Sequence, residues 1–113
     1  MTSHDENERI YFMCAELFKT LANPTRLMIL DLLRSGEKTV NEIAELIGKS
    51  QANISQHLAV LKQRGIITAR REGVNTYYRI ACERAVKLCE LVRDVLHDVL
   101  KEEEKLVRRL EEA

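Results

Sequence analysis

The sequence predicts a mainly helical protein with one β-hairpin, and three observations favour this fold class. Its 113 residues are 45% apolar and 32% charged, the size and balance of a single folded domain over residues 1–113. Four glycines and one proline are too few for the many turns of a β-sandwich. Apolar residues also recur every three or four positions along most of the chain, the spacing of helices with one buried face.

Composition also bears on the compartment. No apolar run is long enough to cross a bilayer, and the first eight residues lack the apolar stretch of a signal peptide. The three cysteines are an odd number, so they are interpreted as free thiols and not as a disulfide framework. We therefore expect a cytoplasmic protein with no membrane partner.

Two helices are expected in the first third of the chain. Ile10 to Leu21 has helical periodicity and predicts a first helix over about residues 8–21. Asn23 and Pro24 suit the N-cap and the first position of a second helix. This second helix is apolar nearly all round and ends at Gly36, so we expect it to be the buried central helix.

Two short helices follow and form a predicted helix-turn-helix over about residues 39–64. Thr39 and Glu42 have the spacing of a capping box, and the helix that they begin ends at Gly48. Ser50 is expected to cap the next helix, which ends at Gly65.

The last part of the chain predicts a hairpin and a long helix. Residues 66–70 and 76–80 are β-prone runs around a short basic loop, 71–75, so residues 66–80 are expected to form a wing. From residue 82 to about 110 a heptad-like seam predicts one helix. Two short helices followed by a basic hairpin are typical of a winged helix-turn-helix domain.

Charge is distributed unevenly, although 18 basic and 18 acidic residues give a net charge of zero. Between residues 49 and 71 there are five basic residues and no acidic one: Lys49, Lys62, Arg64, Arg70 and Arg71. Such a segment suits phosphate, but a solvated basic face is an equally simple interpretation of charge alone.

The second helix of the helix-turn-helix presents amide and hydroxyl side chains that suit base edges. Glutamine and asparagine can pair with adenine through two hydrogen bonds, and serine can donate or accept one. Taken with the basic residues, this face predicts binding of double-stranded DNA. The expected DNA-binding residues are Lys49, Ser50, Gln51, Asn53, Ser55, Gln56, His57, Lys62, Arg64, Arg70, Arg71 and Asn75.

The sequence resembles the ArsR/SmtB family of small dimeric winged-helix repressors over about residues 10–100. The resemblance rests on the runs Leu21–Leu27, Ser50–Leu58 and Gly65–Ile67, and on the hairpin residues 70–73 and 77–80. It implies a homodimer through the first and last helices, about 8–21 and 82–110. It also implies an operator with an inverted repeat, a recognition helix in the major groove, and a wing along the minor groove. His57 is expected to belong to the DNA-binding surface or its support, and not to a metal site.

The metal sites that the resemblance implies are not matched in this sequence. The helix before the recognition helix has no cysteine, and Arg84 and Val95 stand where the last helix would need ligands. Three thiols remain: Cys14, Cys82 and Cys89. Cys82 and Cys89 are too far apart on one helix to form a disulfide, so a pair of Cys14 with either of them across the helix interface is the expected sensor. It would bind arsenite or a soft metal ion, or form a disulfide or polysulfide bridge; no other cofactor is expected.

Two alternatives remain open from the sequence. All three thiols can be packing residues in a regulator without cysteine-based sensing. A helical interaction module that does not bind DNA would use the same apolar seam, although the acid-free segment argues against it. An enzyme is not expected, because no phosphate loop, nucleophile elbow or carboxylate pair is present.

Overall fold

The computed structural model describes residues 3–113, which form five α-helices and three short strands in those residues. The chain divides into two compact units, residues 1–82 and 83–113. In chain order the elements are α1 (Ser3–Leu21), α2 (Pro24–Leu33), β1 (Lys38–Thr39), α3 (Val40–Ile47), α4 (Gln51–Gln63), β2 (Ile67–Glu72), β3 (Asn75–Ile80) and α5 (Glu83–Glu112).

The helix ends follow the local signals in the sequence. The Asn23 side chain accepts a hydrogen bond from the Arg26 amide at 3.1 Å, with Pro24 in the first turn. Thr39 and Glu42 form the complete capping box of α3. Gly48 ends α3 with φ +79°, a left-handed conformation that favours glycine. These contacts confirm the predicted starts of α2 and α3 and the end of α3.

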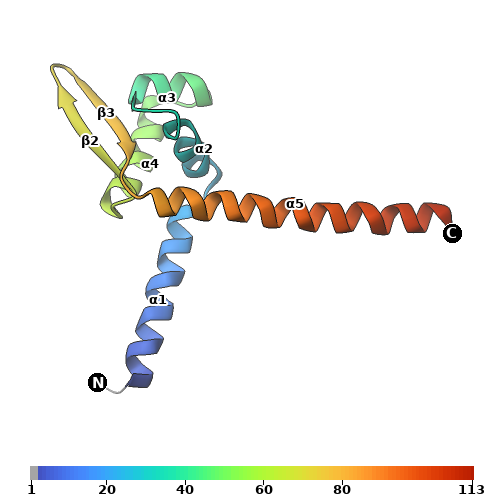
Figure 1. The fold of residues 1–113 in the computed structure, drawn as a ribbon. Helices are drawn as coiled ribbons and strands as arrows, with labels where there is room; N and C mark the ends of the chain where they lie inside the picture. Colours follow the sequence, from blue (N-terminus) through green and yellow to red (C-terminus); the bar gives the residue numbers. More distant parts are fainter. Residues whose placement is uncertain (1–2) are drawn as a thin grey trace. The chain divides into compact units, whose positions relative to one another are not determined.

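The core of the first unit lies where α2, α3 and α4 pack together beside the hairpin (Figure 1). The prediction that α2 is buried nearly all round is wrong, because Leu27 and Met28 are 40% and 43% exposed. Only one stripe of α2 faces inward. The most deeply buried core side chains are Ile29, Leu30, Leu33, Ile43, Ile54, Leu58, Leu61, Ile66 and Ile67.

The hairpin belongs to a three-stranded antiparallel sheet with the order β1-β3-β2. The predicted loop over residues 71–75 is wrong: strand pairing continues to Glu72 and Asn75, which leaves a two-residue turn, Gly73–Val74. Gly73 has φ +62° and Val74 has no positive φ, as in a type II′ hairpin turn. Arg71 therefore lies in a strand, which fixes the direction of its side chain.

The helix α1 begins at Ser3, five residues before the predicted start, and its apolar side chains are mostly uncovered. Thr20 and Leu21 in its last turn are buried, whereas Ile10, Met13 and Phe18 are exposed. The second unit is one helix of 30 residues, α5. No helix within residues 3–113 is long and apolar enough to span a membrane.

Candidate nucleic-acid interface

The N-terminal half of α4 presents most of the side chains that the sequence predicted to read DNA bases. Gln51, Ser55 and Gln56 are exposed, while Ile54 and Leu58 on the opposite face are fully buried in the core. The buried face fixes the rotation of α4 about its axis. The three polar side chains therefore share a surface whose direction is set by packing.

The N-terminus of α4 is an unneutralised positive helix end. The Ser50 hydroxyl accepts a hydrogen bond from the Asn53 amide at 3.1 Å, so Ser50 caps the helix. Its first turn contains no acidic residue, which is also true of α2, whereas the first turns of α1, α3 and α5 each contain one or more. Exposed Lys49 precedes the cap. The helix dipole and the lysine both favour an anion here.

Asn53 differs from its neighbours on α4. It is half-buried, and its Oδ1 atom is buried without a hydrogen-bond partner in the part of the chain that the structure describes. Its backbone amide is satisfied by Ser50. The structure thus places this predicted base-reading residue at the edge of the core.

His57 lies in the middle of α4 and connects this helix to α2 through a contact with Arg26. Arg26 Nη1 lies 3.3 Å from His57 Nδ1, and arginine can only donate, so Nδ1 accepts and the proton of the neutral ring is on Nε2. Burial, followed by the charges of Arg26 and Lys49, lowers the pKa of His57 below 6.5. The neutral form of His57 is therefore favoured, and its contact with Arg26 helps to position the helix.

Arg26 also holds the end of α1. Its Nε donates to the Thr20 carbonyl at 2.5 Å and its Nη2 to the Lys19 carbonyl at 3.3 Å. One side chain thus connects the last turn of α1, the start of α2 and the middle of α4. Arg26 lies within the run Leu21–Leu27, and its partner His57 is 31 positions away, so no local sequence pattern indicates this role.

The five predicted basic residues have different surroundings. Arg64 lies 3.9 Å from Glu16 of α1, and Arg70 is paired with Glu37 and Glu72. Lys49, Lys62 and Arg71 have no ion pair to any residue between 3 and 113. Acidic residues outside the segment 49–71 therefore neutralise part of its charge, which the sequence interval alone did not reveal.

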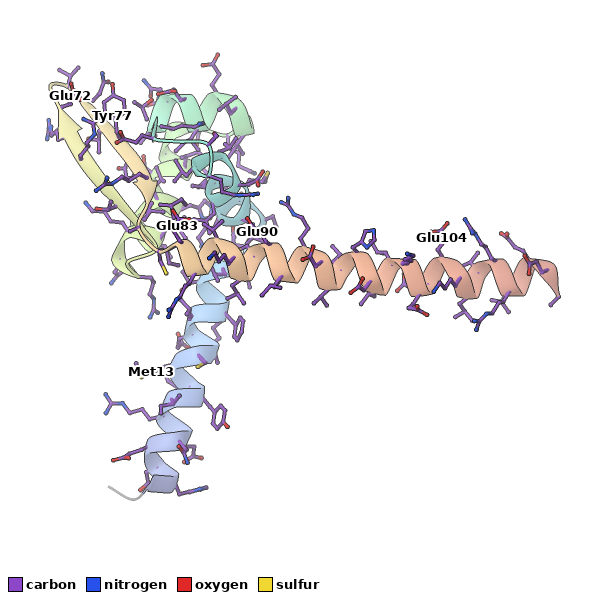
Figure 2. All side chains as sticks on the ribbon, viewed as in Figure 1. Met13, Glu72, Tyr77, Glu83, Glu90 and Glu104 are labelled. Carbon is purple, nitrogen blue, oxygen red and sulfur yellow. The ribbon has the colours of Figure 1, made fainter. Side chains whose placement is uncertain are left out.

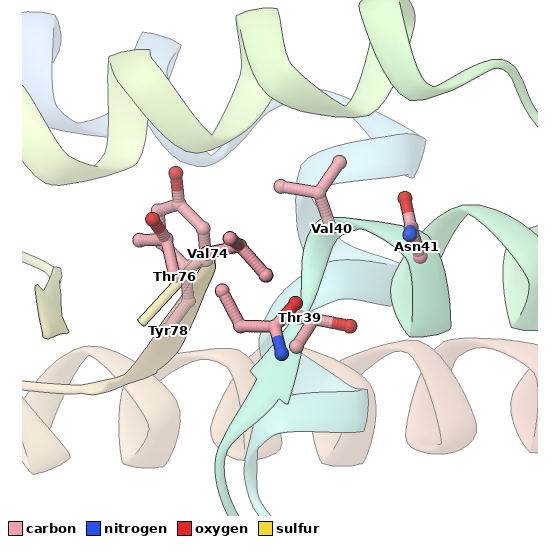
Figure 3. Close-up of a pocket in the computed structure, with 7 residues that line it drawn as sticks. Thr39, Val40, Asn41, Val74, Thr76 and Tyr78 are labelled. Carbon is pink, nitrogen blue, oxygen red and sulfur yellow. The ribbon is translucent and has the colours of Figure 1, made fainter. Parts of the chain in front are cut away.

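A pocket of about 210 Å³ lies between the hairpin and the start of α3 (Figure 3). Thr39, Val40 and Asn41 form one wall. The hairpin side is formed by Val74, Asn75, Thr76 and Tyr78. The predicted DNA-binding residue Asn75 is exposed and belongs to this wall, close to the turn of the hairpin.

The three cysteines are free thiols in different settings. Cys14 is exposed on α1 in the single chain. Cys82 is half-buried directly before α5, and its amide donates to the Ile66 carbonyl at 3.1 Å. Cys89 is half-buried, and burial raises the pKa of its thiol. No group of three potential metal ligands occurs among the described residues.

Comparison with known proteins gives consistent matches in sequence and structure. The family model "bacterial regulatory protein, arsR family" matches residues 23–69. The HTH-type transcriptional regulator Rv0081 of Mycobacterium tuberculosis is 41% identical over 96 residues, 84% of each chain. The biofilm growth-associated repressor of Agrobacterium fabrum is 42% identical over 76 residues, 67% of this chain and 65% of the relative.

Solved structures agree with the sequence matches. The crystal structure of Rv0081 has a TM-score of 0.76 and 39% identity, and the alignment covers 82% of this chain and 94% of the other. The homodimeric winged helix-turn-helix DNA-binding domain Mb0332 of Mycobacterium bovis, solved by NMR, has a TM-score of 0.76 and 41% identity, with 87% and 91% covered. The predicted winged helix-turn-helix fold is confirmed, and the chain belongs to the arsR family of bacterial regulatory proteins.

Proposed function

We propose that this protein is a homodimeric transcriptional repressor that binds an inverted-repeat operator through α4 and the β2–β3 hairpin, here called the wing. The observation that carries the proposal is the N-terminus of α4. It combines an acid-free first turn, unpaired Lys49 and a row of exposed amide and hydroxyl side chains on a helix anchored by the core. Its relatives are transcriptional regulators, one of them named a repressor, and we propose no enzymatic activity. Binding to operator DNA would place the protein in the cytoplasm.

Two kinds of contact are assigned to this surface. Gln51, Ser55 and Gln56 read base edges in the major groove, because amides and hydroxyls match the donor and acceptor pattern there. Lys49, Lys62 and Arg71 neutralise phosphates, because they have no ion pair within residues 3–113 to compete with DNA. We assign the exposed residues Asn75 and Val74, at the tip of the wing, to contacts along the minor groove.

Dimerisation is supported by apolar side chains that the single chain leaves uncovered. On α1 these include Tyr11, Phe12 and Phe18, each more than half exposed. On α5, Val92 and Leu96 are 56% and 55% exposed, and the same stripe continues to Leu110. Monomeric proteins rarely expose apolar stripes of this length. The related Mb0332 domain is homodimeric, which supports the same assembly here.

Operator binding can be tested with fluorescently labelled DNA from the region upstream of the protein's own operon. Gln56→Ala should lose about 1–3 kcal/mol of binding free energy on the operator and little on random DNA, because a base contact is removed. Gln63→Ala is the matched control, because Gln63 is the same residue type and is exposed at the C-terminal end of the same helix. Equal losses for Gln56→Ala on operator and random DNA would contradict base reading at this position.

We further propose that a thiol-reactive effector releases the repressor, and Cys14 is the thiol that supports this. It is exposed on α1, whereas Cys89 is half-buried and has a raised pKa, which makes its thiolate scarcer at neutral pH. Arsenite, a soft metal ion, or an oxidant or polysulfide are the reagent classes that thiols bind or react with.

Operator affinity should be measured with and without arsenite, zinc, diamide and polysulfide. The proteins are the wild type and the variants Cys14→Ser, Cys82→Ser and Cys89→Ser. The change in operator affinity that a reagent causes in the wild type should be absent in Cys14→Ser. A wild type that responds to no reagent, or three variants that all still respond, would leave a regulator without cysteine-based sensing.

A further inference from the structure

Arg70 of β2 lies in a cluster of side chains that spans the wing. Its Nε donates to Glu37 Oε2 at 2.9 Å and its Nη2 to Glu37 Oε1 at 3.3 Å, so the two groups meet as a two-pronged pair. Its Nη1 also donates to Glu72. Its guanidinium carbon lies 4.7 Å from the centre of the Tyr77 ring, a cation–π distance. Three of the five N–H donors of Arg70 thus bond to carboxylates of its own chain.

The positions of these residues in the sheet mean that the cluster connects its two edge strands. The strand order is β1-β3-β2, with Arg70 on β2, Tyr77 on β3 and Glu37 directly before β1. Arg70 therefore crosses above the middle strand and reaches the far edge of the sheet. Only two residue pairs join β1 to β3, Lys38 with Tyr78 and Thr39 with Tyr77. The pair of Arg70 with Glu37 adds a third attachment between the wing and the segment that leads into α3.

The two neighbouring arginines lie on opposite faces of the wing. Successive side chains of a strand alternate, and cross-strand partners share a face. Arg70 is opposite Tyr77, while Arg71 is opposite Thr76, which lines the pocket beside α3. Arg70 and its two carboxylate partners together carry a net charge of −1, so Arg70 has no unneutralised charge to offer a phosphate. Arg79, opposite Thr68, adds one exposed positive charge elsewhere on the same face. Figure 2 labels Glu72 and Tyr77 of this face on the hairpin.

We propose that Arg70 is a positioning residue that fastens the wing to the body of the domain, and that Arg71 alone of the two neutralises a DNA phosphate. The inference rests on the proposed operator binding. It departs from the sequence prediction that both arginines contact DNA. In this assignment Arg70 changes operator affinity only by fixing where Arg71, Val74 and Asn75 are presented.

Operator affinity measured over a series of salt concentrations distinguishes a positioning residue from a phosphate contact. The two variants to compare are Arg70→Gln and Arg71→Gln, which make the same substitution at neighbouring positions. Loss of a phosphate contact makes the slope of log K against log salt shallower by about 0.9. We expect this change for Arg71→Gln only. Arg70→Gln should keep the wild-type slope but bind about 3- to 10-fold more weakly at every salt concentration, a loss of about 0.7–1.4 kcal/mol.

Three further variants test whether geometry or charge is responsible. Arg70→Lys keeps the charge but not the two-pronged pair, so it should bind as weakly as Arg70→Gln. Glu37→Gln should weaken binding similarly, and the double variant Glu37→Gln/Arg70→Gln should be no weaker than either single one. A shallower salt slope for Arg70→Gln, full affinity for Arg70→Lys, or tighter binding by Glu37→Gln would overturn the proposal.

A measurement without DNA keeps this inference distinct from the proposed function. Amide hydrogen exchange at Lys38 and Tyr78, which pair β1 with β3, should be faster in Arg70→Gln and Glu37→Gln than in Arg71→Gln. Equal exchange in all three variants would overturn the attachment of the wing by Arg70. Failure of the wild type to bind any operator would instead overturn the proposed function.

Discussion

Replacement of Arg26 by alanine should be among the more damaging single changes at the surface of the first unit. The bond from Arg26 Nε to the Thr20 carbonyl is 2.5 Å long, and Thr20 is only 5% exposed. This carbonyl is one of the last four of α1, which have no partner within the helix. Its loss of a hydrogen bond in a buried position costs about 1–3 kcal/mol.

The bonds from Arg26 to the Lys19 carbonyl and to His57 Nδ1 are both 3.3 Å long. At this length each adds about 0.5 kcal/mol, the lower end for a hydrogen bond in a folded protein. The expected loss for Arg26→Ala is therefore about 2–4 kcal/mol of the free energy of unfolding. That is a large part of the roughly 5–15 kcal/mol available to a small domain.

Urea unfolding at a fixed protein concentration, followed by circular dichroism, measures this loss. Arg34→Ala is the control, because Arg34 pairs with Asp31 at 3.1 Å and both side chains are nearly half exposed. An ion pair of this kind contributes no more than about 1 kcal/mol. If Arg26→Ala lost no more than Arg34→Ala, the role of half-buried Arg26 as a connection between α1, α2 and α4 would be refuted.

Three other outcomes are expected. Thr39→Ala should lower the free energy of unfolding by about 1 kcal/mol, because the capping box with Glu42 is lost, while Thr39→Ser should lose little; equal losses would exclude the hydroxyl as the cause. The lowered pKa of His57 means that the folded state binds fewer protons than the unfolded state. Its contribution is therefore present above pH 6.5 and is lost as the pH falls through the folded pKa. The wild type should lose stability over this interval relative to His57→Gln, as urea midpoints measured at each pH would show. Gly48→Ala should lose about 1 kcal/mol in the same assay, because φ is +79° there, and Gly48→Asn should lose less.

Elements with local causes could be predicted from the sequence. The start of α2 at Asn23 and the capping box of α3 depend on hydrogen bonds across three residues, and both occur as predicted. The stop at Gly48 depends on one backbone angle. Residue type and spacing contain all the information that such contacts need.

Features that depend on contacts between residues far apart in the sequence could not be predicted, because no local pattern links the partners. The strand β1 has two residues and exists only because β3, nearly 40 residues further along, pairs with it. Glu37 and Arg70 are separated by 33 positions, so no local pattern links them. Pairing of β2 with β3 continues to Glu72 and Asn75, which moves Arg71 from the expected loop into a strand. A count of charge along the chain could not show which arginines already have acidic partners.

The place of β2 at the margin of the sheet has a consequence for the behaviour of the protein at high concentration. With the order β1-β3-β2, the backbone groups along the outer side of β2 have no neighbouring strand among the described residues. An unpaired edge of this kind can recruit the same edge of another molecule, and charged side chains are a common defence. The run Arg70-Arg71-Glu72 is entirely charged and ends the strand. Valine in place of both arginines would leave a β-prone edge with one charge. We therefore expect this charged run to oppose aggregation through the edge of β2, in addition to its roles in the wing.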